Sequence, residues 1–160
     1  MEKTAFTNLF APFDRAGPAE QYRALRAAAR TRFQNLSLPT SRSEDWRFTN
    51  IATLIETPWE LPLADQTIDV RRVPAASAPG AIRLIFANGR LLKVEADPAT
   101  VPPGVQFDSL AETLQIPSAL AQIASDDDSA FTALNTSLLD DGALIVIPDG
   151  KIVADRKSVV

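Results

Sequence analysis

Proline placement is the feature that most constrains how this chain can fold. Seven of its twelve prolines lie between Pro58 and Pro103. Each proline removes a backbone hydrogen-bond donor and biases the residue before it toward extended structure. We therefore expect strands and loops in this stretch and helices on either side of it. Together with the patterns described next, this division predicts a mixed α+β fold.

The sequence before this stretch has the pattern of an amphipathic helix from Pro18 to Leu36. Its apolar residues recur at steps of three and four and therefore share one helical face. Gly17-Pro18 suits the start, because the fixed φ of proline fits the first helical position and its missing N–H has no partner there. The helix is expected to end before Pro39. The apolar face consists of Tyr22, Leu25, Ala29, Phe33 and Leu36.

A second, shorter helix is predicted over residues 46–54. A serine three residues before a glutamate, Ser41 and Glu44, matches the capping-box pattern of a helix start. The residues expected to be buried on this helix and just after it are Trp46, Ile51, Leu54 and Ile55.

Three further helices are predicted after residue 108. Cap residues and an acidic first turn predict a helix over 109–115, and another helical stretch follows over 118–124. The last one begins at Ser129 and ends before the turn at 140–142. Its apolar residues, spaced for one face, are Phe131, Leu134 and Leu138.

A β-hairpin is predicted around Asn88-Gly89. The branched and apolar runs over 82–86 and 91–94 flank this dipeptide. Asparagine and glycine tolerate the positive φ values that a type I′ turn needs, so the two runs should pair as antiparallel strands.

Three more strands are predicted in the second half of the chain. A brief one lies over 105–107, and two rich in branched residues, 143–147 and 151–153, flank a turn at Pro148-Asp149-Gly150. A continuous apolar strand needs cover on both of its faces. We therefore expect an exposed apolar edge over Ala143 to Val153, through which the chain self-associates.

The absence of cysteine and histidine excludes several kinds of active site. The chain contains neither residue, so it has no thiolate nucleophile, no Ser-His-Asp triad, no zinc finger and no cysteine-ligated iron-sulfur cluster. Its six glycines are never closer than eight residues apart, which argues against a glycine-rich phosphate loop. We expect no catalytic, cofactor-binding or metal-ligating residue in this chain.

The charge balance gives no reason to expect a nucleic acid or an anionic membrane as partner. Lysine and arginine number 16 against 20 aspartates and glutamates, a formal net charge of -4. The start of the chain shows no export signal, and the longest apolar run, residues 143–148, is too short to span a bilayer. We therefore expect a cytoplasmic protein with no nucleic-acid or membrane partner.

Arg23, Arg26 and Arg30 lie together beside the apolar face of the first helix and admit two interpretations. They form a basic face that docks an acidic partner, in which case the chain is a free-standing interaction domain. Alternatively, they are long charged side chains that solvate the flank of the helix, which is the simpler interpretation.

Two sets of carboxylates also admit a functional interpretation. Asp126-Asp127-Asp128 could seat calcium, but the cluster lacks the alternating ligands of a calcium loop and more simply complements a helix dipole. A hydrolase with paired carboxylates would need several acidic residues to converge, whereas Asp140 and Asp141 before Gly142 are typical of a turn. The acidic residues in question are Glu44, Asp45, Asp140 and Asp141.

The Trp46-Arg47 pair could clamp a ligand through a cation-π contact. We prefer the interpretation that Trp46 is a packing anchor.

Three motifs, in this order, resemble segments of the SufD family of the SUF iron-sulfur cluster assembly machinery. They are LPTSRSEDWRFTN at 38–50, IFANGRL at 85–91, and FTALNT at 131–136 continuing through Asp141-Gly142 to IPDG at 147–150. Phe48 replaces the tyrosine that is more usual in the family, which removes a hydroxyl and keeps the ring. The Trp-Arg segment favours SufD over its paralogue SufB.

The resemblance implies the N-terminal part of a non-enzymatic scaffold subunit in a SufB–SufC–SufD complex, with SufB-like and SufC-like partners. It implies a helical N-terminal region that leads into a right-handed parallel β-helix, whose first strands would lie in this chain. Residues implicated in cluster formation and in docking the ATPase SufC are expected outside this fragment. The motif residues are expected to determine the fold: Asn88, Gly89, Gly142 and Gly150 in turns, Trp46 and Phe131 in packing.

We expect four consecutive parts in the chain. They are an N-terminal helical region (1–57), a mixed strand and helix region with the Asn-Gly hairpin (58–140), the start of a truncated β-helix (141–154), and a tail (155–160). The tail departs from the family pattern, and our hypothesis is that it is a common sequencing adapter translated in frame. We expect it to be non-native.

Overall fold

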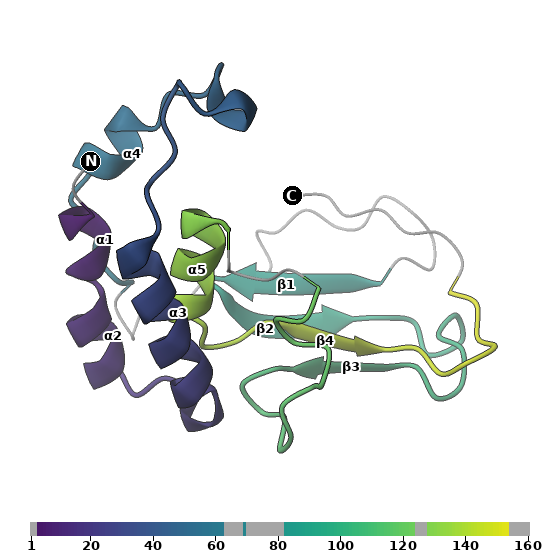
Figure 1. Ribbon diagram of the computed structural model, residues 1–160. Coiled ribbons are helices and arrows are strands. Elements are labelled where there is room, and N and C mark those ends of the chain that lie inside the picture. Colours follow the sequence, from purple (N-terminus) through teal and green to yellow (C-terminus); the bar gives the residue numbers. More distant parts are fainter. Residues whose placement is uncertain (1–2, 63–68, 70–81, 124–127, 154–160) are drawn as a thin grey trace. The chain divides into compact units, whose positions relative to one another are not determined.

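The computed structural model describes residues 3–62, 69, 82–123 and 128–153 (Figure 1). The chain forms two compact units, and each is built from two separate stretches of sequence. The helical unit comprises Met1–Gln66 and Gln115–Asp140, and the strand unit comprises Thr67–Leu114 and Asp141–Val160. Helices and small antiparallel sheets are both present, which confirms the α+β class. The division into four consecutive parts remains a prediction, and the tail lies outside the described residues.

The helical unit is organised around the packing of helix α3 against helix α5. Its core contains Phe6, Phe33, Leu38, Ile51, Ala130 and Ala133. Ala29 on α3 and Ala133 on α5 are fully buried, and small side chains let two helices approach closely. The helices are α1 (Thr4–Thr7), α2 (Phe10–Arg15), α3 (Arg23–Asn35), α4 (Ala52–Glu56) and α5 (Ala130–Ser137), and the 3-10 turns are η1 (Glu20–Tyr22) and η2 (Glu44–Trp46).

The helix predicted over residues 18–36 is confirmed as η1 followed by α3. Tyr22, Ala29 and Phe33 of the predicted apolar face are fully buried. Arg26 lies on the same face and is buried too, which the sequence analysis did not predict.

The helix predicted over residues 46–54 is wrong. Residues 44–46 form the turn η2, and helix begins again only at Ala52. The Asn50 side-chain oxygen accepts a hydrogen bond from the Ala52 N–H (2.9 Å), which starts α4 as a separate helix. The capping box does not form either, because Ser43, not Ser41, precedes η2, and its hydroxyl accepts from the Thr40 N–H.

The helices predicted over 109–115 and 118–124 are also wrong, as far as the structure describes those residues. Ser109 ends a β-strand, and turns follow it through residue 112. Residues 118–122 form turns, and Ala121 has a φ of 59°, which a right-handed helix does not accommodate. Residue 124 lies outside the described part.

The helix predicted from Ser129 is confirmed as α5. The Ser129 hydroxyl caps it by accepting a hydrogen bond from the Thr132 N–H (3.2 Å). The buried face differs from the predicted one, because the small residues of the helix lie deepest and the larger apolar residues pack around them. The buried residues are Ala130, Ala133, Thr136 and Ser137, while Phe131 and Leu134 are half-buried against the core.

The predicted hairpin is confirmed in the strand unit. Strands β1 (Arg83–Ala87) and β2 (Arg90–Glu95) are antiparallel and are joined by the two residues that the sequence analysis assigned to the turn. Asn88 has a φ of 51° and Gly89 a φ of 83°, as a type I′ turn requires. A bulge lies between Ile85 and Phe86.

A second two-stranded antiparallel sheet pairs β3 (Gln106–Ser109) with β4 (Ala143–Val146). These two strands confirm the predictions at 105–107 and 143–147, with shifted ends. The strand predicted over 151–153 does not form: the Lys151 N–H bonds to the Pro148 carbonyl (3.1 Å), and residues 151–153 then follow without regular structure. The described strands make only antiparallel pairs, so they contain no β-helix coil.

Among the described residues, no helix combines the length and the apolar character that are needed to cross a bilayer.

Candidate functional site

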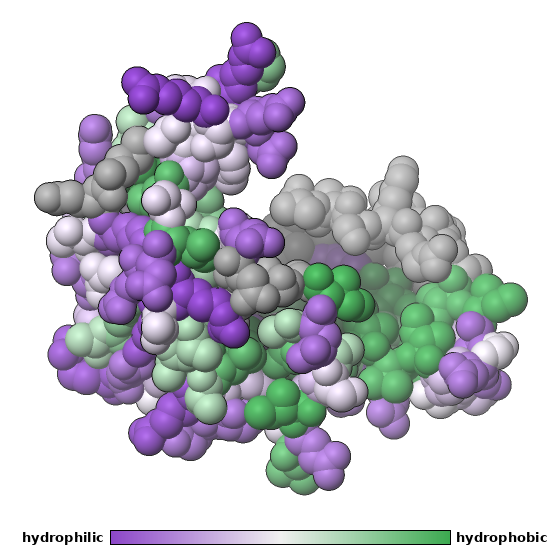
Figure 2. Space-filling view, in the orientation of Figure 1, coloured by the Kyte–Doolittle hydropathy of each residue, from purple (hydrophilic) through white to green (hydrophobic). Residues whose placement is uncertain are grey.

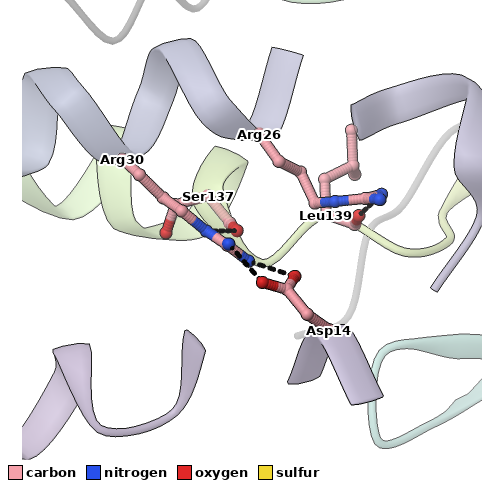
Figure 3. Close-up of polar contacts among 5 residues, drawn as sticks. All are labelled: Asp14, Arg26, Arg30, Ser137 and Leu139. Carbon is pink, nitrogen blue, oxygen red and sulfur yellow. Dashed lines mark hydrogen bonds and ion pairs between the residues drawn. The ribbon is translucent and has the colours of Figure 1, made fainter. Parts of the chain in front are cut away.

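Two arginines of α3, one helical turn apart, meet the C-terminal end of α5 (Figure 3). Arg26 Nη1 donates to the carbonyl oxygens of Leu139 (3.0 Å) and Ala19 (2.7 Å), and Arg30 Nε donates to that of Ser137 (3.3 Å). The last carbonyls of a helix have no intrahelical partner, and the end of the helix carries partial negative charge. Arg30 therefore caps α5, and Arg26 bonds to the chain two residues beyond the end of this helix.

Arg30 also forms a bidentate ion pair with Asp14 of α2 (Figure 3). Its two terminal nitrogens lie 2.7 and 2.8 Å from the two carboxylate oxygens. The hydrogen bond from Arg30 lowers the pKa of Asp14 below its ordinary value, against the raising effect of partial burial. The guanidinium also lies over the Phe10 ring at 4.7 Å. One side chain thus links α2, α3 and α5.

Neither interpretation of the three arginines, a basic docking face or solvation of the helix flank, fits Arg26 and Arg30. Arg26 is only 4% exposed, and burial lowers the pKa of its guanidinium. Arg30 is paired with Asp14, so neither side chain solvates the flank of the helix. Arg23 alone is largely exposed, and it pairs with Glu20 at 3.0 Å.

A shallow pocket of about 310 Å³ borders this arginine cluster. The carboxylates of Asp14 and Glu20 line it together with the three arginines, so most of the positive charge there is already balanced within the chain.

Asp141 is the polar centre of the strand unit. Its Oδ1 accepts hydrogen bonds from the Ser109 hydroxyl (2.7 Å) and from the N–H groups of Ala111 (3.0 Å) and Gly142 (2.7 Å). Its Oδ2 accepts one from the Leu91 N–H (2.7 Å). Burial acts to raise the pKa of Asp141, but these four hydrogen bonds outweigh it and lower the pKa. The carboxylate ties the start of β2 to the end of β3.

The neighbouring Asp140 serves the other unit. Its Oδ1 accepts a hydrogen bond from the Ala19 N–H (2.8 Å), just before η1. Glu44 and Asp45 are exposed. In the part of the chain that the structure describes, no group of three acidic residues is arranged to hold a metal ion, and Asp126 and Asp127 lie outside that part.

Trp46 packs against Phe131 with ring centroids 5.3 Å apart and adjoins the core of the helical unit. This agrees with its interpretation as a packing anchor. Arg47 instead lies 5.5 Å from the ring of Phe48, whose side chain is 93% exposed.

The buried role of Arg26 was not predicted, and Asp141 was predicted only as part of a turn. A signal for Arg26 exists, because it stands four residues after Tyr22 and three before Ala29, within the apolar face. No local pattern marks Asp141 as an acceptor, because its partners lie about 30 and 50 residues away.

Replacing Arg30 with glutamine should cost about 1 kcal/mol of stability, because the ion pair is partly exposed and only one side of it is lost. The lowered pKa of Asp14 implies that the pair stabilises the fold above the unfolded-state pKa of about 3.9 and ceases to do so as the pH falls through the folded-state value. Urea unfolding at neutral and acidic pH measures the loss of stability and its pH dependence. The difference in unfolding free energy between Arg30→Gln and the parent should shrink in acid.

The matched control for this prediction is Arg23→Gln, which removes an equally charged but largely exposed side chain. It should change stability by less than about 0.5 kcal/mol. An equal loss in the two arginine variants would contradict the structural role of Arg30.

The described structure is that of a mixed α+β protein whose buried charged groups join its own helices and strands. A sequence model of the family described as "SufBD protein N-terminal region" matches residues 4–157. The chain therefore belongs to the SufB/SufD family, and this membership indicates a role in iron-sulfur cluster assembly within the Suf system. Neither the curated proteins nor the solved structures gave a match to this chain.

Proposed function

We propose that this chain is the N-terminal part of a cytoplasmic SufD-like scaffold subunit and has no enzymatic activity of its own. It would form a complex with SufB-like and SufC-like subunits, and iron-sulfur clusters would be assembled on that complex. The cluster ligands and the ATPase-docking residues would lie outside residues 1–160, and β4 would lead into a β-helix.

The observation that carries this proposal is that the three family motifs contact one another in pairs. In the helical unit, Trp46 of the first motif packs on Phe131 of the third. In the strand unit, the Leu91 N–H of the second motif bonds to Asp141 of the third. Residues that join distant segments in this way determine a fold, and the chain supplies no cysteine or histidine for cluster chemistry. Motif residues that hold the fold together and the absence of cluster-ligating residue types are both typical of a scaffold subunit.

The assignment to SufD over SufB rests on the Trp46-Arg47 segment alone, so the experiment separates the two. Residues 4–157 replace the corresponding N-terminal region of a SufD subunit and, separately, of a SufB subunit. Each chimera is co-expressed with the other two subunits, and the complex is recovered through a tag on the SufC subunit. We expect the SufD chimera to yield the three-subunit complex and the SufB chimera to lose it.

A SufD chimera that carries Asp141→Asn serves as the matched control, because it weakens hydrogen bonds within the strand unit and leaves the rest of the chimera unchanged. It should assemble less well than the parent chimera. Equal assembly of the SufB and SufD chimeras would remove the assignment to SufD. Failure of both, alongside assembly of the unmodified subunits, would overturn the scaffold role.

A further inference from the structure

The tip of the β1–β2 hairpin carries the only asparagine in the sequence that is followed by glycine. Asn88 and Gly89 are both exposed. A Cβ atom on Gly89 would meet nothing beyond its chain neighbours within 4 Å, so the space beside this peptide bond is open. Within the part of the chain that the structure describes, the Asn88 amide has no hydrogen-bond partner. The side chain can therefore turn toward the Gly89 nitrogen without losing a contact.

We propose that Asn88 is a site of spontaneous deamidation in the folded chain. The Gly89 nitrogen gives up its proton to solvent base and attacks Cγ of Asn88 as an intramolecular nucleophile. The new N–Cγ bond closes a succinimide ring, and the Cγ–Nδ2 bond breaks to release ammonia, which takes a proton from water. Water then adds to one ring carbonyl, and the ring C–N bond at that carbonyl breaks. Opening at Cγ gives aspartate, and opening at the main-chain carbonyl gives isoaspartate.

The other four asparagines of the chain are less suited to this reaction. Each is followed by a residue with a branched side chain, which crowds the nitrogen that must attack. The N–H groups of Leu9 and Leu36, which follow two of them, already donate to backbone carbonyls (3.1 and 2.9 Å). The Asn50 side chain is held by the Ala52 N–H (2.9 Å). These four asparagines are Asn8, Asn35, Asn50 and Asn135.

The hairpin allows the opening that ring closure needs. Closure rotates the Cα–C bond of Asn88 away from its orientation in the type I′ turn, so the tip must open first. The described sheet of β1 and β2 has two strands, and an isolated pair is marginally stable. A bulge lies between Ile85 and Phe86. Phe86 is 44% and Leu92 46% exposed, and hydrophobic side chains lie at the surface over the strands of this unit (Figure 2). With so little cover, the tip opens at low cost.

The isoaspartate product should disrupt the hairpin. Its main chain runs through Cβ and Cγ, so one extra backbone atom enters a turn whose length fixes the register of the strands. The Leu91 N–H bond to Asp141 (2.7 Å) anchors the start of β2. The extra atom therefore displaces β1 along β2, and the pairing of Ala87 with Arg90 should be lost. Aspartate keeps the normal backbone and tolerates positive φ, so its hairpin should persist. The inference rests on the strand unit alone and does not depend on the proposed function.

Incubation of the full chain in mildly alkaline buffer, where more of the Gly89 amide is deprotonated, tests the site. Mass spectrometry of its peptides measures conversion as the gain in mass when OH replaces NH₂, and chromatography separates aspartate from isoaspartate. We expect Asn88 in the folded chain to react at least about tenfold faster than each of the other asparagines. Equal rates at all five asparagines would overturn the proposal. So would conversion of Asn88 in a parallel urea-unfolded sample with none in the folded chain.

The matched control is Asn88→Gly, because Gly-Gly also forms a type I′ turn but offers no side-chain amide. Freshly prepared Asn88→Asp supplies the new charge without the extra backbone atom. Amide hydrogen exchange along β1 and β2 is measured before and after incubation. We expect protection to be lost in the isoaspartate form of the incubated parent and kept in incubated Asn88→Gly and in fresh Asn88→Asp. An equal loss of protection in either control would overturn the disruption by isoaspartate.

Discussion

Replacing Asp141 with asparagine should destabilise the strand unit by about 2–4 kcal/mol. The carboxylate accepts four hydrogen bonds, which join β2, the segment after β3 and the start of β4. Asparagine keeps an oxygen at the Oδ1 position but places an NH₂ group against the Leu91 N–H, where two donors then face each other. The loss of charge also weakens the bonds that remain.

Amide hydrogen exchange along β1 to β4 measures this loss directly, because exchange reports stability segment by segment. The neighbouring Asp140→Asn is the matched control. Its Oδ1 accepts from the Ala19 N–H and its charge acts on Arg26, both in the helical unit, so the stability measured along β1 to β4 should fall by less than about 1 kcal/mol. Equal losses of stability along β1 to β4 in Asp141→Asn and Asp140→Asn would contradict the role of Asp141 as the central acceptor of the strand unit.

The same carboxylate makes the strand unit sensitive to acid. Hydrogen bonding holds the pKa of Asp141 below its ordinary value despite burial, so the ionised form is favoured by folding. Its contribution is complete above the unfolded-state pKa of about 3.9 and is lost as the pH falls through the folded-state pKa. The stability difference between the parent and Asp141→Asn should therefore narrow in acid. A difference that is constant with pH would contradict this role.

Replacing Phe33 with alanine should destabilise the helical unit by about 3–5 kcal/mol. The side chain is fully buried on α3 and meets the rings of Phe6 and Phe10 edge-on, each at 6.2 Å between centroids. Lys3 lies over its ring at 4.9 Å. Removing the ring leaves a cavity at the point where α1, α2 and α3 meet.

Tryptophan fluorescence during urea unfolding monitors this unit, because both tryptophans, Trp46 and Trp59, belong to it. Phe48→Ala removes the same ring from a site that is 93% exposed and should change stability by less than about 0.5 kcal/mol. A comparable loss in both phenylalanine variants would mean that Phe33 does not lie in the core.

Local signals predicted three elements well. Asn88-Gly89 fixes a tight turn through its tolerance of positive φ, the spacing of Tyr22, Ala29 and Phe33 fixes the buried face of α3, and the hydroxyl of Ser129 starts α5. Each depends on residues within a few positions of one another. Such local interactions depend only on the sequence of the segment itself, so they can be predicted without knowledge of the tertiary structure.

The remaining features depend on partners far along the chain, and only the tertiary structure decided them. Residues 109–112 have helical caps but are held in a turn, because Ser109 and Ala111 bond to Asp141. Arg26 stands in the apolar face of α3, and its charged group is stable there because the carbonyls of Ala19 and Leu139 accept its hydrogen bonds. The sequence alone determined the turn, the apolar face and the helix cap. The folded chain decided which polar groups are buried, since a buried charge is stable only where its partners are brought to it.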